Sequence, residues 1–368
     1  MKGSIVFLVG VVVVGSVVGG VAAIGLCDYK PPRTDVTSAW LSGTYRYFDA
    51  PTTPGVDVNA GRATVHFSRL YDSPSFGYTF SGLGELGFTD LALSSATASG
   101  ASTLRYYFVA GEPIFGFAGL NAGHVLGQPA PALTVSVGGG YGRFADVTPL
   151  AKAMRIQTML LGRRAITQAL PEATLLAVAT EIGRAIEYAE VKDLVATVVN
   201  LIEDAAMTGL DPRAVLAVED EILATGAERY CGWAIQAGLG YELSDPYGGP
   251  QDLVVTASAD AAYAPGPEGQ LLLRAVLEGP FDIVNQHSLS ANLSYEQGLS
   301  ATSSLQGTVA YTRVKPLGLD PVDAASVTVQ LAFSLGQANV GISVGLSRAP
   351  GAAEWATDLS ISFAMKIL

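Results

Sequence analysis

Large apolar residues alternate with small or polar residues along most of this chain. In the last segment, Leu359, Ile361 and Phe363 are separated by small or polar side chains, and 325–336 and 339–348 show the same pattern. Side chains of a β-strand point to opposite faces with a period of two residues. Each such segment therefore presents one apolar face and one small or polar face, and the sequence predicts a chain dominated by two-faced strands.

About fourteen segments show this alternation, and most are about 10–14 residues long, which suits a tilted strand that crosses a membrane. We place them at 36–48, 61–72, 74–87, 102–110, 113–123, 131–144, 229–243, 251–264, 269–280, 286–297, 302–314, 325–336, 339–348 and 354–367.

The connections between these segments alternate in length. Short DSP and GEP turns follow the second and fourth segments, whereas the long connections DAPTTPGVDVNAG and KPLGLDPVDAA follow the first and eleventh. A Ser/Ala/Gly stretch after the third segment also reads as a long connection. Short turns at one end and longer loops at the other are typical of membrane-spanning β-barrels.

The composition supports a strand face that meets lipid. Charged residues make up 15% of the chain and glycine occurs 42 times, whereas soluble proteins average about 25% charged residues. A soluble sandwich, the alternative, would expose a charged face, but the polar faces here are rich in Gly, Ser and Ala. Because lipid offers no hydrogen-bond partner to a strand edge, we expect an all-β transmembrane antiparallel barrel of about fourteen strands. The net charge of −12 argues against a nucleic-acid-binding protein.

The periodicity changes to that of helices at 147–228, between the sixth and seventh strands. A Thr-Pro pair beginning at Thr148 and an Asp-Pro pair beginning at Asp211 read as helix N-termini, and Gly209 suits a helix stop. We expect about four helices, each with an apolar stripe and a charged face. This block is too charged to span lipid, and it divides the barrel into 36–144 and 229–368.

The N-terminus combines Lys2 with a long uncharged run and the small-residue stretch VAA at 21–23. This arrangement predicts a signal peptide over 1–23; a transmembrane helix and a lipoprotein cleaved before Cys27 are the alternatives. Only one other cysteine, Cys231, is present. The pair can form one disulfide in an exported chain, but Cys231 has the outward parity of its strand, which makes a bridge less natural. Bridged, free and lipidated cysteines remain open.

The strand pattern of 36–144 and 229–368 resembles that of the bacterial outer-membrane β-barrel superfamily. The resemblance implies a bacterial outer-membrane location, periplasmic termini, and a periplasmic position for the helical block at 147–228. It also implies lipid and lipopolysaccharide as neighbours.

Strand parity predicts which charged side chains point into the barrel. The expected lumen-lining residues are Arg62, His66, Arg105, Glu242, Asp260, Arg274, Glu278 and Glu296. Arg313, Lys315 and Arg348 have outward parity at the extracellular strand ends, where lipopolysaccharide phosphates would lie. Snorkelling at a strand end is the alternative for these three.

Catalytic and metal chemistry find little support in the sequence. The three histidines, His66, His124 and His287, and the two cysteines have no metal-ligand spacing. Serine and aspartate lie near His124 and His287, but a serine-rich chain offers such neighbours by composition alone. We therefore expect neither an enzyme nor a bound metal or cofactor.

Two functions remain as hypotheses. The first is a porin-like channel for small polar solutes, because a barrel of this size needs water, a ligand or a plug to fill its interior. The second is a structural or assembly protein whose barrel is an anchor and whose helices at 147–228 bind a periplasmic partner, another subunit or the cell wall.

Overall fold

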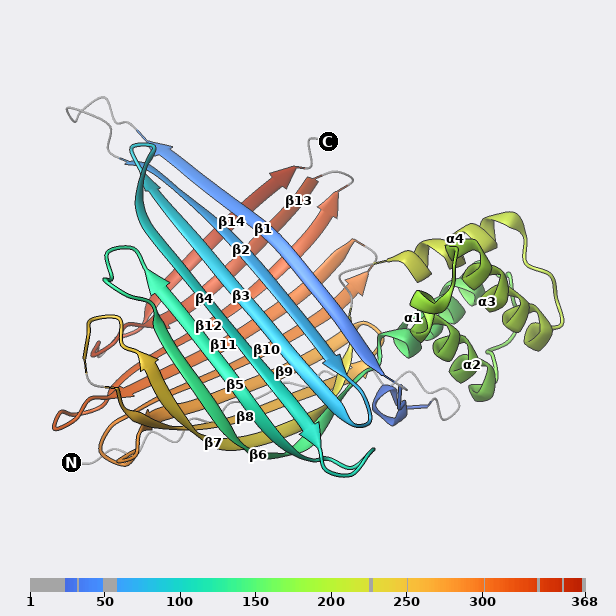
Figure 1. The fold of residues 1–368 in the computed structure, drawn as a ribbon. Coiled ribbons are helices and arrows are strands. Elements are labelled where there is room, and N and C mark those ends of the chain that lie inside the picture. The colour runs from blue at the N-terminus through green and yellow to red at the C-terminus, as the bar shows by residue number, and fades with distance from the viewer. Residues whose placement is uncertain are drawn as a thin grey trace, which may run out of the picture.

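The computed structural model describes residues 24–31, 33–48, 58–224, 228–249, 251–300, 302–335, 338–352 and 354–365. The predicted signal peptide at 1–23 lies outside these residues. Fourteen strands form one sheet in chain order, every neighbouring pair is antiparallel, and Figure 1 shows them side by side. The prediction of about fourteen antiparallel strands is confirmed.

The first seven strands are β1 (Thr34–Phe48), β2 (Val58–Asp72), β3 (Phe76–Thr89), β4 (Ala92–Tyr107), β5 (Ile114–Val125), β6 (Ala132–Asp146) and β7 (Tyr230–Ser244). The other seven are β8 (Leu253–Gly266), β9 (Gly269–Pro280), β10 (His287–Ser300), β11 (Ser303–Lys315), β12 (Val322–Leu335), β13 (Ala338–Arg348) and β14 (Ala356–Met365).

One predicted connection is wrong. The Ser/Ala/Gly stretch expected as a long loop after β3 is the first half of β4, and Asp90 and Leu91 alone join the two strands. Both residues have positive φ, 52° and 61°, as a type I′ hairpin turn requires. The following connection, expected to be a tight GEP turn, is longer than this one. Small side chains hid the strand because they show no apolar alternation.

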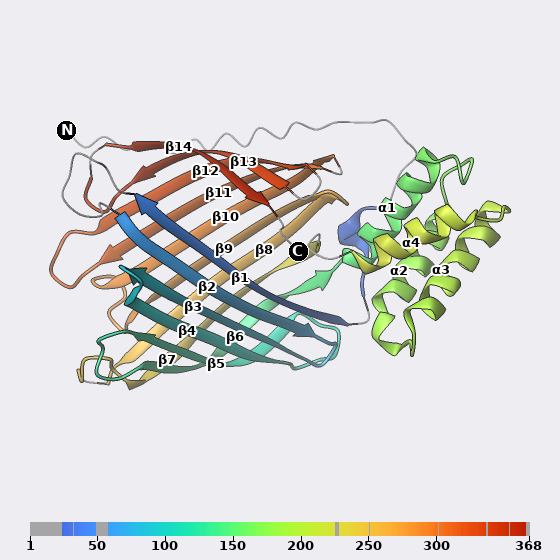
Figure 2. The same ribbon diagram turned by 90° about the horizontal axis from the view of Figure 1, so that it is seen from above.

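The register gives the sheet two different faces. Large apolar side chains such as Leu41, Val137, Ile235 and Val344 are exposed on the outward face, and they occupy alternate positions of paired strands. Serine, threonine, glycine and a few charged residues occupy the inward positions. The curl of the sheet brings β2–β6 opposite β8–β10 around a hollow (Figure 2).

The sheet is open, in contrast to the predicted closed barrel. Within the described residues, no pairing joins β1 to β14. The start of β1 is instead fixed near the end of β6, where Thr34 Oγ1 accepts a hydrogen bond of 3.1 Å from the backbone N–H of Asp146. In addition, β14 has 10 residues and β1 has 15. The first strand therefore leans towards β6 at its start, and the described part of β14 is shorter than β1.

Four helices extend from one end of the sheet, which we call the helical end; the opposite end is the far end (Figures 1 and 2). They are α1 (Thr148–Gly162), α2 (Glu172–Gly183), α3 (Val191–Ala206) and α4 (Pro212–Leu223), and two short 3-10 helices are η1 (Leu26–Asp28) and η2 (Ala185–Glu187). The predicted helices at 147–228 are therefore present. No helix in the described part of the chain combines the length and apolar character needed to cross a membrane.

The helix termini agree with the sequence only in part. Asp211 caps α4 as predicted, because its side chain accepts a 2.7 Å hydrogen bond from the Ala214 N–H. The N-cap of α1, however, is Val147 rather than Thr148. The C-cap of α3 is Met207, whose φ of 51° is left-handed, so the helix ends before Gly209. An apolar core that includes Leu150, Ile156, Val198, Ile202 and Val218 holds the helices together.

The two cysteines form a disulfide. Cys27 and Cys231 have Cα atoms 5.2 Å apart, and the outward-parity argument against the bridge is wrong. The side of β7 that carries Cys231 is covered at this end by η1, which lies against β7 and β8. Leu26, the first residue of η1, and Tyr29, the residue after it, enter the apolar core of the helices. The N-terminal segment is therefore part of the junction between sheet and helices.

Candidate functional site

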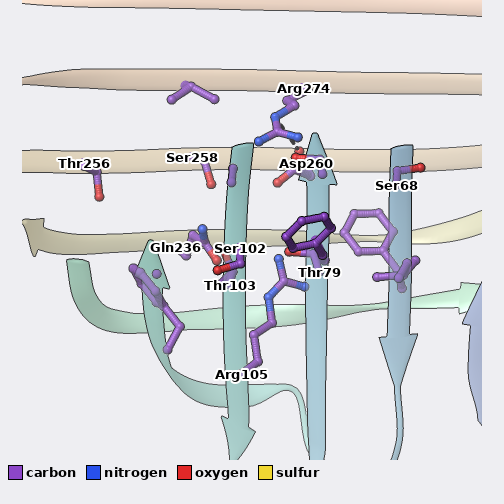
Figure 3. A pocket seen from close by; sticks show the side chains of 18 of the residues that line it. Ser68, Thr79, Ser102, Thr103, Arg105, Gln236, Thr256, Ser258, Asp260 and Arg274 are labelled. Atoms are coloured by element: carbon purple, nitrogen blue, oxygen red, sulfur yellow. Dashed lines mark ion pairs between the residues drawn. The ribbon is translucent and has the colours of Figure 1, made fainter. Parts of the chain in front are cut away.

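The hollow inside the curled sheet contains a cavity of about 600 Å³ near the helical end, which we call the helix-end cavity. Hydroxyl and amide groups from several strands point into it (Figure 3). Its polar lining includes Ser68, Thr79, Ser102, Thr103, Gln236, Thr256, Ser258 and Asn292. Phe117, Phe144 and Leu272 add apolar surface to the lining of the cavity. The cavity therefore offers both hydrogen-bonding groups and apolar contact to a small molecule.

A second cavity of about 830 Å³, the far-end cavity, adjoins the first. The two share Ser81, Ala101, Asn121, Thr256 and Glu278, so the hollow runs along the inner face of the sheet. Lys315 and the carboxylates Glu242, Asp252 and Glu278 line the far-end cavity. The far-end cavity is therefore the more acidic of the two.

Most of the residues predicted to line a lumen lie along this hollow. Arg105, Asp260 and Arg274 line the helix-end cavity, His66 and Glu242 line the far-end cavity, and Glu278 lines both. The other two, Arg62 and Glu296, line neither cavity within the described residues. A role for any of these side chains in permeation stays a prediction.

Carboxylates neutralise several of the arginines on the sheet. Arg274 Nε lies 3.7 Å from Asp260 Oδ1 across the β8–β9 pair, and Arg62 Nε lies 3.3 Å from Glu85 Oε1. Arg143 Nε lies 3.5 Å from Asp72 Oδ2. The first two pairs join neighbouring strands, and the third joins β6 to β2. These ion pairs therefore also stabilise the sheet.

Arg105 differs from these arginines. It is 9% exposed, and its guanidinium lies 5.1 Å from the centre of the Phe115 ring. Within the described residues, its Nε has no hydrogen-bond partner and its guanidinium forms no ion pair. Asp260 is close enough to Arg105 for an electrostatic interaction. Asp72 also lies close enough for such an interaction, so Arg105 brings into the helix-end cavity a buried positive charge that has no direct ion pair among the described residues.

Two aromatic rings cover glycines beneath this cavity. A Cβ at Gly140 would lie 2.6 Å from Phe115 Cε2, and a Cβ at Gly138 would lie 2.7 Å from Phe117 Cε1. The glycines of β6 thus leave room for rings from β5, and the rings cover backbone that has no side chain of its own. Sequence reasoning missed these inward aromatics, although Phe115 and Phe117 alternate in the sequence as inward residues would.

The three residues predicted to contact lipopolysaccharide have partners within the chain. Arg313 Nε lies 3.8 Å from Asp323 Oδ1, and Lys315 Nζ donates a 2.7 Å hydrogen bond to the Val284 carbonyl. The Arg348 guanidinium lies 5.7 Å from the centre of the Trp355 ring. All three lie at far-end strand termini, but Lys315 also lines the far-end cavity, which differs from its predicted outward parity. Contact of the three residues with a lipid phosphate stays a prediction.

The helices are fixed to the helical end of the sheet by two arginines. Arg155 Nη1 and Arg229 Nε donate hydrogen bonds of 2.9 and 3.0 Å to the Pro267 carbonyl in the β8–β9 turn. Arg155 also pairs with Glu221 at 2.6 Å. Burial lowers the pKa of Arg229, and the negative charge of Glu296 opposes this shift. Because α1, α4 and the β8–β9 turn meet here, the helical block is held to the sheet by side-chain contacts as well as by its chain connections.

The N-terminal segment and Lys152 complete this junction. Tyr29 Oη donates a 3.3 Å hydrogen bond to the Ala179 carbonyl of α2, and burial raises the pKa of Tyr29 to about 12. Lys152 Nζ donates to the carbonyls of Ile222 and Ala224, at 2.6 and 2.8 Å, which satisfies free carbonyls at the end of α4. Burial lowers the pKa of Lys152. None of the described residues of α1–α4 lines either cavity.

The fold and the hollow define a class: a curled antiparallel β-sheet protein with a polar interior and a helical block at one end. No protein-family model matches the chain, and no curated protein matches it significantly.

Proposed function

We propose that the chain is a bacterial outer-membrane protein that forms a channel for small polar solutes. The observation that carries the proposal is the contrast between the two faces of one sheet. The outward face exposes large apolar side chains, Leu41 by 73% and Val137 by 64%, whereas hydroxyl, amide and charged groups line the cavities of the inward face. Lipid outside and water inside would match both faces.

The proposal includes closure of the sheet in lipid. All neighbouring strands are antiparallel, and with fourteen strands β1 and β14 also run in opposite directions. Their directions are therefore compatible with antiparallel pairing. A lipid-exposed edge would leave backbone N–H and C=O groups without partners, which costs several kcal/mol for each group. That cost favours a barrel closed by β1 and β14 in the membrane.

Conductance in a planar lipid bilayer tests the channel. We expect the purified chain to give steady current steps. Asn292 lines the helix-end cavity, so Asn292→Trp should reduce the unit conductance by narrowing the hollow. Ala291, the preceding residue of β10, points to the other face, and Ala291→Trp is the matched control that should leave the conductance unchanged. A silent wild-type chain, or equal effects of the two variants, would contradict the channel.

A second function, an anchored docking protein, is favoured by the position of the helices. They lie beyond the strand ends (Figure 2), and their described residues line neither cavity, which favours docking over a plug. Ile186 and Val191 are exposed by 72% and 45% on this block. In this proposal the helices bind a periplasmic protein, another subunit or the cell wall.

Replacing residues 150–223 by a flexible linker tests whether the helices obstruct the channel or lie outside it. If the helices only dock a partner, the unit conductance of the shortened chain should equal that of the full chain. A severalfold increase would mean that the helices obstruct the channel and would contradict their placement outside the hollow. Folding of the shortened chain is checked by its β-sheet circular dichroism.

A further inference from the structure

Of the three arginines that line the helix-end cavity, Arg69 and Arg274 have ion-pair partners, whereas Arg105 has none among the described residues. Arg105 projects from β4 into the cavity towards the wall that carries Asp260 and Arg274 (Figure 3). Arg274 is neutralised by Asp260 at 3.7 Å. Arg105 is 9% exposed and, within the described residues, has neither an ion pair nor a partner for its Nε. A buried charge without a partner is costly, so its presence needs a reason.

We propose that Arg105 is the binding residue of a site for small solutes that carry one carboxylate on an apolar body. A guanidinium binds a carboxylate through two parallel N–H···O bonds, and such a ligand would supply the partner that Arg105 lacks. The inference rests on the proposed channel, because it names the solute class of the same hollow.

The surroundings of Arg105 favour one negative charge over several. Asp260 and Glu278 line the same cavity, and their carboxylates oppose a dianion such as phosphate. Phe115 lies against the guanidinium and fixes its position through a cation–π contact. These carboxylates therefore oppose a ligand with one negative charge less than a ligand with two or more.

The apolar part of the ligand is inferred from the apolar side chains that line the same cavity. Phe117, Phe144 and Leu272 line the cavity that Arg105 enters. A cavity of about 600 Å³ lies within the range of small-molecule sites, which combine apolar walls with a few polar groups that orient the ligand. Benzoate has the required features, one carboxylate and one apolar ring, and serves as the probe.

Benzoate binding to the full chain in lipid nanodiscs, followed by saturation-transfer NMR, tests the site. We expect wild-type protein to bind benzoate and to bind benzamide, which has the same shape without the charge, at least tenfold more weakly. Arg105→Gln should weaken benzoate binding at least tenfold. Arg163→Gln, which removes the same charge from the helical block, should leave it unchanged.

Equal binding of benzoate and benzamide, or equal losses in Arg105→Gln and Arg163→Gln, would overturn the proposal. Arg105→Lys covers the case in which Arg105→Gln fails to fold: it keeps the charge without the planar fork and should weaken benzoate binding severalfold, and unchanged binding would count against the site. A chain that conducts without binding benzoate overturns this inference alone. A chain that binds benzoate without conducting supports the site and contradicts the channel.

Discussion

At the scale of the residue, glycine determines how tightly the sheet can curl around its hollow. Gly140 on β6 lies beneath the ring of Phe115, and a Cβ there would lie 2.6 Å from the ring and from the Ile235 carbonyl. Neither the ring nor the backbone oxygen can move without disturbing the wall. Gly138 and Gly140 are therefore required by packing at the point where β5, β6 and β7 meet.

The matching prediction compares two glycine-to-alanine changes. Gly140→Ala should destabilise the folded chain by about 1–3 kcal/mol, the usual cost of overpacking. Gly307→Ala is the control, because a Cβ at Gly307 has no heavy atom within 4 Å; its effect should be close to zero. Urea unfolding in detergent, followed by tryptophan fluorescence, measures both. Equal effects would mean that the contact with Phe115 is not tight.

The loop between β7 and β8 contains a carboxylate with a pH-dependent role. Asp245 Oδ1 accepts hydrogen bonds of 2.8 Å from the N–H groups of Tyr247 and Gly249, and these bonds lower the pKa of Asp245. A folded-state pKa below the unfolded one means that the stabilisation is complete above the ordinary value of about 3.9. It is lost as the pH falls through the lower, folded value.

We therefore expect the amides of Tyr247 and Gly249 to lose protection from hydrogen exchange in acid, once intrinsic rates are corrected for. In Asp245→Asn, which keeps the acceptor oxygen but does not titrate, protection should not vary with pH. Hydrogen–deuterium exchange with mass spectrometry at several pH values measures this. The same acid-induced loss in the Asn variant would show that another group is responsible.

At the scale of the element, strand prediction depended on the size of the outward side chain. Segments with Leu, Ile, Val or Phe at alternate positions show the period of a strand. The first half of β4, ALSSATASGA, shows no such period and reads as a loop in the sequence. Its side chains are too small to show a period. What makes it a strand is its pairing with β3 and β5 on both sides, which is a tertiary constraint.

The N-terminal segment was also beyond sequence reasoning. Its bridge to Cys231 depends on η1 covering the outside of β7, and nothing in the parity of β7 predicts that cover. The disulfide spans 204 residues, and cross-links of such long loops stabilise proteins by roughly 2–5 kcal/mol. It holds Leu26 and Tyr29 in the core of the helical block.

Reduction should therefore destabilise the junction. We expect a reductant to lower the urea midpoint of the wild-type chain by an amount that corresponds to roughly 2–5 kcal/mol. In the double variant Cys27→Ser with Cys231→Ser, the midpoint should already be low and should not respond to reductant. A wild-type midpoint that is insensitive to reductant, although thiol labelling shows reduction, would contradict this role.

At the scale of the whole molecule, the sequence predicts the two faces and the number of strands well, because both follow from the period of two. It also identifies most charged residues of the hollow, since inward parity is a local property. Which of these charged side chains contact one another is not determined by local sequence. The pairing of Arg274 with Asp260, and the lack of a partner for Arg105, depend on strand register and on the curl of the sheet.

Closure of the sheet is a prediction at this scale. In lipid, cysteine at Leu41 of β1 should form a disulfide with cysteine at Leu359 or Ile361 of β14, because pairing would bring these strands to about 5 Å. Cysteine at Val329 of β12 is the control partner and should not react with Leu41→Cys. Gel mobility after oxidation in liposomes identifies the cross-linked chain. Cross-links only between two chains would indicate edges that pair with another copy.

The proposed channel depends on the orientation of the two sheet faces relative to lipid and water, and spin-label accessibility along β10 measures this orientation. Single labels at positions 289–294 would be reconstituted in lipid vesicles with the native disulfide intact. If the outward face meets lipid, we expect labels at Leu289, Ala291 and Leu293 to be relaxed by oxygen, which is concentrated in the bilayer. Labels at Ser290 and Asn292 should instead be relaxed by a water-soluble nickel chelate. If the labels show no such alternation, or the reverse alternation, the outward face does not meet lipid and the proposed membrane-spanning sheet is contradicted.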